Sequence, residues 1–563
     1  MADILRILST SRDALLANLT AINVTGSNVA NVNTPGYSRV RPIFGSISQS
    51  GIGIDRSSVG VNIQEIQRIY DKYLEAQIVQ QQQEIGYHDM RKSMLDRVES
   101  SLNESDGGGI NELLSKFWNA WNDLAANPSG STERDVLLKT SESLAYRFRQ
   151  QGDDLLDIQQ DANTTIADLI TETNADLVEF ASLNDKIVTI EIDGGNANSL
   201  RDTRAQLLKE IGTTLDIQYY ETSDGAVNIY LANGNALVQG DIYWQLDAVE
   251  NVDNSSYYDI VITTSPGEVL NGVITGGKIG ALLELRDATL VGYINQLNDL
   301  AINVANKVNS QHRLGYDMYN NAGGLFFSEI TDARDMQVAA AIAADSQKIA
   351  AASTVNGDGG NALAMGTLKD ERMYMSLSAI TATDFDAGGD NPAARAVLNN
   401  RAEAYKATTS NIVLTRGAAP GDWTVTGNGG YAGLAVLSAD ATTIVLDLDN
   451  SGTADITITL TGTWEQDDTL SFSMSADETS STQSDYFSNL LSRVGQDVLS
   501  AGQNADRQED VMTQLENQRE SVSGVSIDEE MMQLMKYQFA YSAAGQLVTT
   551  VKEMLDLLIE LGR

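Results

Sequence analysis

Residues 526–558 read SIDEEMMQLMKYQFAYSAAGQLVTTVKEMLDLL, and their apolar side chains recur at alternating spacings of three and four. Eight positions form this seam: Leu534, Tyr537, Tyr541, Ala544, Val548, Val551, Leu555 and Leu558. Such a heptad repeat predicts a helix that packs along a partner. Ser526 and Glu529 fit the capping-box pattern S-x-x-E, so we expect the helix to begin near Ile527 and to run almost to Arg563.

A second seam lies near the N-terminal end. Its apolar residues follow a three-four spacing that Arg12 and Gly26 interrupt: Leu5, Leu8, Leu15, Leu19, Ile22 and Val29. The helix should stop at Asn33-Thr34-Pro35-Gly36, a turn signal in which Gly36 is expected to take a positive φ. A lone amphipathic helix cannot bury its own seam, so each terminal helix needs a partner, either within the chain or from neighbouring copies.

Helical and β-rich segments alternate between these two ends. The hydrophobic pattern predicts a helical rod over 61–213, with one long helix at 132–190, and the rod continues in 276–315 and 480–509. An inserted β-rich subdomain is expected at 214–275, where Asp224-Gly225 and Asn233-Gly234 suit type I′ hairpin turns. An Ala- and Gly-rich helix-loop region follows at 316–404, and an outer β-rich domain at 405–479.

The predicted fold class is therefore α+β and multidomain. It is a long helical bundle or coiled coil, built from both chain ends and interrupted helices, with inserted antiparallel β-rich domains.

Charge and composition exclude several classes of protein. The chain has 563 residues, and its 37 Lys and Arg against 77 Asp and Glu give a formal net charge of 37 − 77 = −40. An excess of this sign argues against binding to nucleic acid or to an anionic membrane surface. No apolar run approaches the length of a membrane span, and the charged N-terminal segment does not fit a cleavable signal peptide. We therefore expect a cytosolic protein or one exported without a classical signal.

The sequence offers no catalytic constellation. Cysteine is absent, and His88 and His312 are too few for a histidine-rich metal centre. The glycine runs at 107–109 and 357–360 lack the lysine of a phosphate loop. We therefore expect no enzyme activity and no cofactor.

One calcium-like fragment spans residues 447–455. It offers oxygen donors at Asp447, Asp449, Ser451 and Asp455, but Ile458 stands where a calcium loop needs a bidentate Glu. Asp, Asn and Gly also make ordinary hairpin turns, and we favour that interpretation.

Two segments resemble a known family. Residues 23–39, NVTGSNVANVNTPGYSR, and residues 523–544, SGVSIDEEMMQLMKYQFAYSAA, are similar to the bacterial flagellar axial proteins, and within them to the hook-associated proteins. Residues 275–327 fit as well, 328–362 fit loosely, and the β segment near 405–476 matches no fixed pattern. The resemblance implies an assembly motif at Asn31, Asn33, Thr34, Pro35, Gly36, Tyr37 and Arg39.

The resemblance implies a structural role in a flagellar layer between hook and filament. It also implies that the N-terminal coiled-coil segment 1–60 pairs with segment 510–563 of the same chain. The implied partners are copies of the chain itself, the hook protein, a second hook–filament junction protein, and an export chaperone on the C-terminal helix. It implies type III export to the extracellular flagellum without a cleaved signal peptide. The alternative is an extracellular adhesin or carbohydrate-active protein with β modules on a helical stalk, for which Trp244, Trp423 and Trp464 could line a cleft.

Overall fold

The computed structural model describes most of the chain and divides into two compact units. The first unit comprises Met1–Leu95, Gln160–Ala288 and Val498–Arg563, and the second comprises Asp96–Gln159 and Thr289–Asp497. The described residues are 2–34, 36–48, 58–103, 108–354, 357–375, 383–385, 395–398, 411–430, 433–447, 456–461, 464, 466–472 and 477–561.

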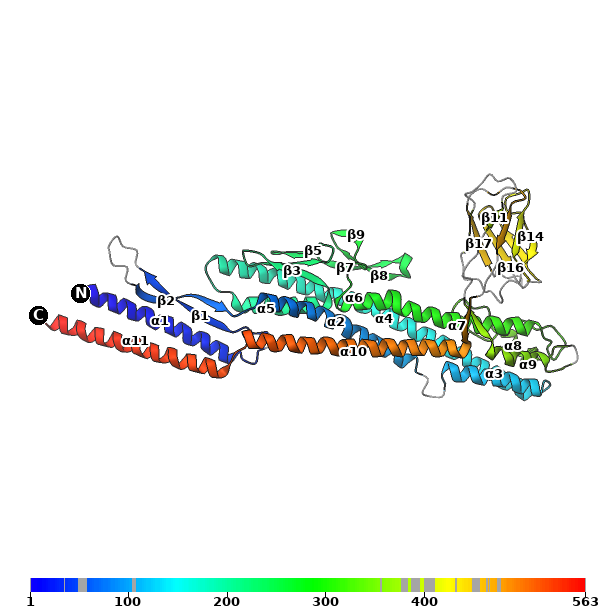
Figure 1. Cartoon of the computed structure of the whole chain (residues 1–563), viewed down its shortest axis with the longest axis horizontal. Helices are drawn as coiled ribbons and strands as arrows, with labels where there is room; N and C mark the ends of the chain where they lie inside the picture. The colour runs from blue at the N-terminus through cyan, green and yellow to red at the C-terminus, as the bar shows by residue number, and fades with distance from the viewer. Residues whose placement is uncertain are drawn as a thin grey trace. The chain divides into compact units, whose positions relative to one another are not determined.

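Long helices dominate the first unit. Helix α1 (Ala2–Ala30) packs along α11 (Ile527–Leu561), which begins at the residue that the capping pattern predicts (Figure 1). Helix α10 (Gln483–Ser523) runs unbroken past residue 509, where the hydrophobic pattern predicts a boundary. The remaining α-helices that lie wholly or partly in this unit are α2 (Lys72–Ser101), α4 (Ser131–Ile192), α5 (Asn198–Thr214) and α6 (Gly277–Glu284). Helix α4 confirms the long helix predicted over 132–190.

A hairpin and two small sheets complete this unit. Strands β1 (Val40–Ser48) and β2 (Ser58–Arg68) pair antiparallel, so the predicted boundary at residue 60 falls inside β2. One sheet has the order β3 (Ile217–Glu221), β4 (Val227–Leu231), β5 (Ala236–Gln239) and β6 (Ile242–Tyr243). The other has the order β7 (Leu246–Asn251), β8 (Tyr257–Ile262) and β9 (Ser265–Val269).

The two predicted hairpin turns form, but their predicted type was wrong. A type I′ turn needs positive φ at both central residues, and only the glycines have it, Gly225 at 89° and Gly234 at 88°. The Asp224 carboxylate accepts hydrogen bonds from the Thr222 hydroxyl and the Ala226 N–H, which anchors the turn without positive φ at Asp224. The loops are therefore ordinary turns closed by a left-handed glycine.

A π-helical turn, Leu285–Thr289, joins α6 (Gly277–Glu284) to α7 (Leu290–Arg313). It carries Arg286, which is fully buried. The guanidinium donates to the Asn163 Oδ1 and the Tyr258 carbonyl, each at 2.8 Å, and pairs with Asp287 at 2.7 Å. These partners compensate the cost of burying its charge.

An aromatic cluster forms the core of the second unit. Trp121 of α3 (Ile110–Ala126) has its ring centroid 5.2 Å from that of Phe326, and Phe117 and Phe327 complete the cluster. His312, near the end of α7, lies against Phe326 with ring centroids 5.4 Å apart. The short helices α8 (Ala340–Ala344) and α9 (Gly360–Thr367) belong to the predicted helix-loop region.

The outer β domain has two four-stranded antiparallel sheets. The first has the order β11 (Thr383–Phe385), β18 (Thr469–Phe472), β13 (Ile412–Arg416) and β14 (Trp423–Asn428). The second has the order β12 (Arg395–Leu398), β17 (Ile456–Thr461), β16 (Thr443–Asp447) and β15 (Ala435–Ala439). Strand β10 (Arg372–Met375) pairs with β19 (Asp477–Thr482). Strands β11 and β12 correct the predicted start of this domain at residue 405.

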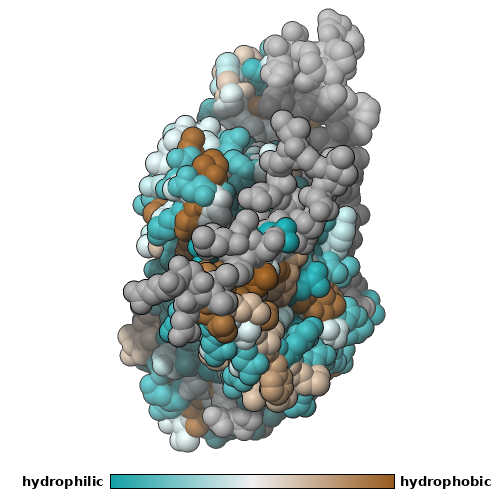
Figure 2. All heavy atoms as spheres, turned by 90° about the vertical axis from the view of Figure 1, so that its left-hand side faces the viewer, coloured by the Kyte–Doolittle hydropathy of each residue, from teal (hydrophilic) through white to brown (hydrophobic). Residues whose placement is uncertain are grey.

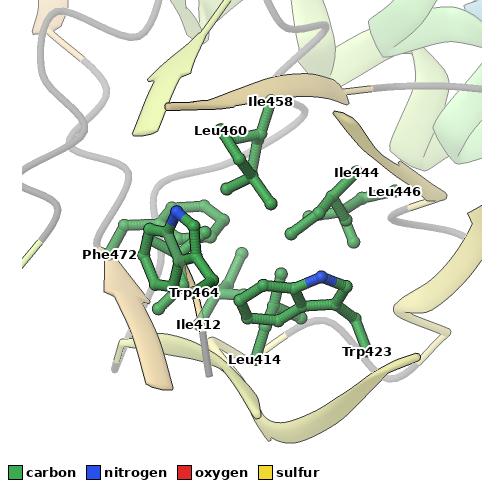
Figure 3. Close-up of a cluster of buried hydrophobic side chains, with 10 residues drawn as sticks. Ile412, Leu414, Trp423, Ile444, Leu446, Ile458, Leu460, Trp464 and Phe472 are labelled. Carbon is green, nitrogen blue, oxygen red and sulfur yellow. The ribbon is translucent and has the colours of Figure 1, made fainter. Parts of the chain in front are cut away.

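The core of this domain lies between its two sheets. Figure 3 shows Trp423 and Trp464 pointing toward aliphatic side chains from both sheets, among them Leu414, Ile444 and Leu460. The two indole rings meet edge to face with centroids 5.4 Å apart. Because both tryptophans are buried, they stabilise the domain and do not line a ligand cleft.

Candidate assembly site at the paired chain ends

The turn after α1 is held by its own backbone. Asn31 N–H donates to the Ser27 carbonyl, Thr34 N–H to the Asn31 carbonyl, and Tyr37 N–H to the Thr34 carbonyl. Gly36 has φ +80°, which confirms the predicted positive φ. Asn33 and Thr34 are exposed, Asn31 bonds locally to Ser27, and the predicted motif residue Pro35 lies outside the described residues.

The side chain of Asn28 forms hydrogen bonds both to this turn and to the C-terminal helix α11. Its Oδ1 accepts hydrogen bonds from the Tyr37 hydroxyl at 2.9 Å and the Val40 N–H at 3.1 Å. Its Nδ2 donates to the Val40 carbonyl at 2.8 Å and to Glu530 Oε2 at 2.9 Å. The side chain is 1% exposed, and these four bonds satisfy its polar atoms as burial requires. Burial also raises the pKa of the Tyr37 hydroxyl, so it stays protonated as a donor.

Arg39 and Glu530 form an ion pair at the first turn of α11. The guanidinium donates from Nε to Glu530 Oε1 at 2.7 Å and from Nη1 to Glu529 Oε2 at 2.9 Å. Glu530 is 3% exposed, and a carboxylate buried to this degree needs charged and hydrogen-bonded partners. It also lies in the first turn of α11, where the helix dipole favours negative charge.

A second group of ion pairs connects the turn to helices α2, α5 and α10. Glu75 of α2 accepts from Arg519 Nε of α10 at 2.7 Å and pairs with Lys209 Nζ of α5 at 3.0 Å. Burial alone would raise the pKa of Glu75, but the positive charges and hydrogen bonds of Lys209 and Arg519 outweigh it and lower the pKa. Arg519 Nη2 also reaches the Tyr37 carbonyl at 3.5 Å.

Sequence reasoning found part of this network. It named Gly36, Tyr37 and Arg39, and it missed Asn28 and Glu530. Two sequence features point to this ion pair. Residues 528–530 are three consecutive acidic residues at the start of a predicted helix, and the motif at residues 23–39 ends in Arg39.

Helix α11 carries apolar side chains on two opposite sides. On the predicted seam Ala544 and Val551 are 5% and 2% exposed, and Tyr541 is 39% exposed. Four more seam residues are half-buried: Leu534, Tyr537, Val548 and Leu555. The side chain of the eighth, Leu558, lies outside the described residues.

The opposite side, which we call the second face of α11, is apolar and exposed. It comprises Met531, Met532, Met535, Phe539, Leu547, Met554 and Leu557. At about 100° of rotation per residue, Met532, Met535, Phe539 and Leu557 lie opposite the seam, and Leu547 and Met554 lie at the border between the two sides. Figure 2 looks onto the end of the molecule that carries both chain termini, and hydrophobic residues reach the surface there.

Helix α1 differs from its prediction in the side that it buries. Ala17, Ala21, Val24 and Asn28 form one buried row, because small side chains let a helix approach its neighbours closely. The predicted seam lies on the other side, with Leu19 43% exposed. Four of its members are half-buried, namely Leu8, Leu15, Ile22 and Val29, and the Leu5 side chain lies outside the described residues. Their role in contacts with other subunits stays a prediction.

The other candidate residues do not converge on a site. Asp449, Ser451 and Asp455 of the calcium-like loop lie outside the described residues, and Asp447 is buried in β16. Among the described residues, no group of three or more His, Asp or Glu side chains could hold a metal ion. His88 lies 3.8 Å from Glu84 on α2. Within the same described part, no helix is long and apolar enough to cross a membrane.

Three family models match separate segments of this chain. The model of the flagellar hook-associated protein FlgK helical domain matches residues 95–327. The flagella basal body rod protein model matches residues 8–37, and the C-terminal model of the flagellar basal body rod FlgEFG proteins matches residues 516–561. The last two matches cover most of α1 with its turn and all of α11.

Full-length relatives agree with these matches. Flagellar hook-associated protein 1 of Bacillus subtilis is 24% identical over 587 residues, covering 98% of this chain and 97% of that protein. The Escherichia coli protein of the same name is 25% identical over 577 residues, covering 99% of each. The solved structure of the flagellar hook junction protein FlgK from Burkholderia pseudomallei has a TM-score of 0.50 and 17% identity, over 79% of this chain and all of that one, which supports the fold.

Proposed function

We propose that this chain, a flagellar axial protein that resembles hook-associated protein 1 from end to end, forms the junction layer between hook and filament by packing its terminal helices against those of neighbouring copies. The observation that carries the proposal is the second face of α11, seven exposed apolar side chains on a helix whose other side already packs within the chain.

The physical argument rests on burial. A helix that is apolar on two sides is stable only when both sides are covered. Within one chain, α1 buries the seam of α11. The second face stays exposed and would be buried only by contact with another subunit. A tubular assembly with heterologous contacts between successive copies provides that cover for every subunit.

The proposed partners follow from a position between hook and filament. They are copies of the chain, the hook protein, a second hook–filament junction protein and, before export, a chaperone on α11. The site of action is the extracellular flagellum, reached by export without a cleaved signal peptide. The role is structural and not enzymatic.

A matched pair of variants tests the proposal. Leu547 on the second face and Leu499 on α10 are 53% and 55% exposed. Leu547→Glu should reduce layer formation on purified hooks at least tenfold without changing thermal unfolding, because a charge would be buried in the assembled layer. Leu499→Glu should leave layer formation unchanged. Equal loss in both variants, or in neither, would contradict the proposal.

A further inference from the structure

Methionine is unevenly exposed in this chain. The sequence has no cysteine and 14 methionines, so methionine is its only sulfur-containing residue. Five methionines with described side chains are exposed, and four of them lie on the second face of α11: Met531 at 46%, Met532 at 60%, Met535 at 47% and Met554 at 49%. The fifth is Met318, in the second unit. Five others are buried, namely Met94, Met336, Met365, Met373 and Met512.

We propose that Met531, Met532 and Met535 form an oxidation site, and that converting them to sulfoxides in the free subunit prevents its incorporation into the junction layer. The oxidation site itself rests only on the exposure and chemistry of these side chains. The effect of oxidation on incorporation into the layer rests on the proposed function. The three thioethers lie within two turns at the start of α11, next to the buried residue Glu530.

The reaction uses a peroxide as the oxidant. The thioether sulfur attacks one peroxide oxygen, the O–O bond breaks, and an S=O bond forms, giving methionine sulfoxide and one water from hydrogen peroxide. Sulfur loses two electrons and the peroxide gains them. The product is polar and chiral where the thioether was flexible and apolar.

The position of the cluster decides the consequence. Met531, Met535 and Phe539 follow one another at i, i+4 and i+8, so they form one continuous row. This row points away from the seam that packs on α1, so oxidation does not require unfolding of the pair. A sulfoxide on this row would have to be desolvated on contact with another subunit. Once the layer has formed, the same contact would shield the sulfur atoms from peroxide.

The experiment treats the purified full-length chain with hydrogen peroxide and maps sulfoxides by peptide mass spectrometry. Met531, Met532 and Met535 should oxidise at least tenfold faster than Met94, Met336 and Met365. Layer formation on purified hooks should fall at least tenfold after treatment, while thermal unfolding stays unchanged, and a methionine sulfoxide reductase should restore it.

Variants separate this site from other effects of peroxide. The triple variant Met531→Leu, Met532→Leu, Met535→Leu has no thioether at the cluster, so peroxide should not change the amount of layer that this variant forms relative to its own untreated sample. Met318→Leu should remain sensitive, since it leaves the α11 cluster intact. A fall in layer formation by the triple variant on peroxide treatment, or full layer formation by wild type with the cluster oxidised, overturns the inference.

Failure of the proposed function gives a different result. If the untreated protein forms no layer, the proposed function fails and the assembly consequence fails with it. The oxidation site is still decided by the sulfoxide map, because uniform oxidation of exposed and buried methionines would refute it in either case.

Discussion

At the scale of single residues, the geometry of the chain ends depends on a few buried polar side chains. Asn28 makes four hydrogen bonds that join α1, the turn and α11, and Glu530 receives one of them together with the Arg39 guanidinium. Removing one partner would leave the other buried and unsatisfied, which costs more than the bond itself contributes. The packing of α11 against α1 and the turn therefore depends on this network.

Gly36→Val should weaken the turn. At φ +80° a β-branched side chain is strained, and we expect a cost of about 1–3 kcal/mol. Hydrogen exchange across residues 28–40 should accelerate, and cells carrying the variant should release filament subunits into the medium because the junction assembles poorly. Gly36→Asn is the control, since asparagine tolerates the left-handed region, and it should behave nearly like wild type. Normal filaments and unchanged exchange in Gly36→Val would contradict the role of this φ.

The sequence predicted the local part of this site and missed the distant part. The turn and the positive φ of Gly36 follow from residue preferences within a few positions. The contact between Asn28 and Glu530 joins residues 502 positions apart, and no local pattern encodes which of three successive carboxylates will turn inward. The resemblance named Arg39, whose partner is set by the packing of α1 on α11.

His312 should make the second unit sensitive to acid. Its ring is fully buried, Nδ1 donates to the Gly324 carbonyl at 2.7 Å, and Nε2 accepts the Ala350 N–H at 2.8 Å. Burial lowers its pKa to about 4; the hydrogen bond to Gly324 and the charge of Asp317 oppose that shift, while Arg134 adds to it. The folded state therefore binds the proton less tightly than the unfolded chain, and the free energy of unfolding should fall by roughly 3 kcal/mol as the pH drops from about 6.5 to about 4.

Urea unfolding followed by tryptophan fluorescence of this core, measured at several pH values, checks this expectation. His312→Gln cannot titrate, so its stability should decline less steeply above pH 4.5, where most carboxylates are still ionised. His88→Gln lies in the first unit and should leave the slope of the second unit unchanged. The same slope in wild type and His312→Gln would show that another group is responsible.

At the scale of elements, hydrophobic periodicity over many residues predicts the bounds of long helices well, whereas it does not locate short strands. Helix α4 differs from its predicted bounds by one residue at the start and two at the end. Strands β11 and β12 have three and four residues and pair with β18 and β17, more than fifty positions later. Segments this short carry no readable alternation, and their pairing is decided by the sandwich core.

The outer β domain should be removable at the β10–β19 pair. Met375 lies opposite Asp477 in an antiparallel register, so the two strand ends are already adjacent. Replacing residues 376–476 by Asn-Gly should close a hairpin, because this dipeptide supplies the backbone that a two-residue turn needs. We expect the thermal unfolding of the helical remainder and its assembly on hooks to be unchanged.

A control with Ile-Ile in place of Asn-Gly tests whether the hairpin closes as described. β-Branched residues resist positive φ, so this shortened chain should be less stable than its Asn-Gly counterpart. Loss of helical content in both shortened chains would mean that the outer domain is needed for the second unit to fold.

At the scale of the whole molecule, the structure combines a well-packed interior with chain ends that are only partly covered. Helices α3 and α4 bury large aromatic side chains, among them Trp121, Phe148 and Phe180. The helices α1 and α11 instead pair mainly with each other, α1 also packs against the β1–β2 hairpin, and each helix keeps apolar side chains exposed. Elements with few buried contacts open at low free energy, so the ends should be the least stable part of the free subunit.

Hydrogen exchange on the soluble monomer tests this distribution. Residues 1–30 and 530–561 should exchange much faster than residues 132–190 and 278–312, because a two-helix pair covers only one side of each helix. Within the two end helices, exchange should be slowest near Asn28 and Glu530, because their hydrogen bonds hold the end of α1 against the first turn of α11. It should be fastest toward the chain termini. In the assembled junction layer the same residues should become protected, since neighbouring subunits would then cover the second face of α11. Strong protection of both ends in a proven monomer would show that the pair is self-sufficient, and assembly would then proceed by docking of preformed helices and not by coupled folding.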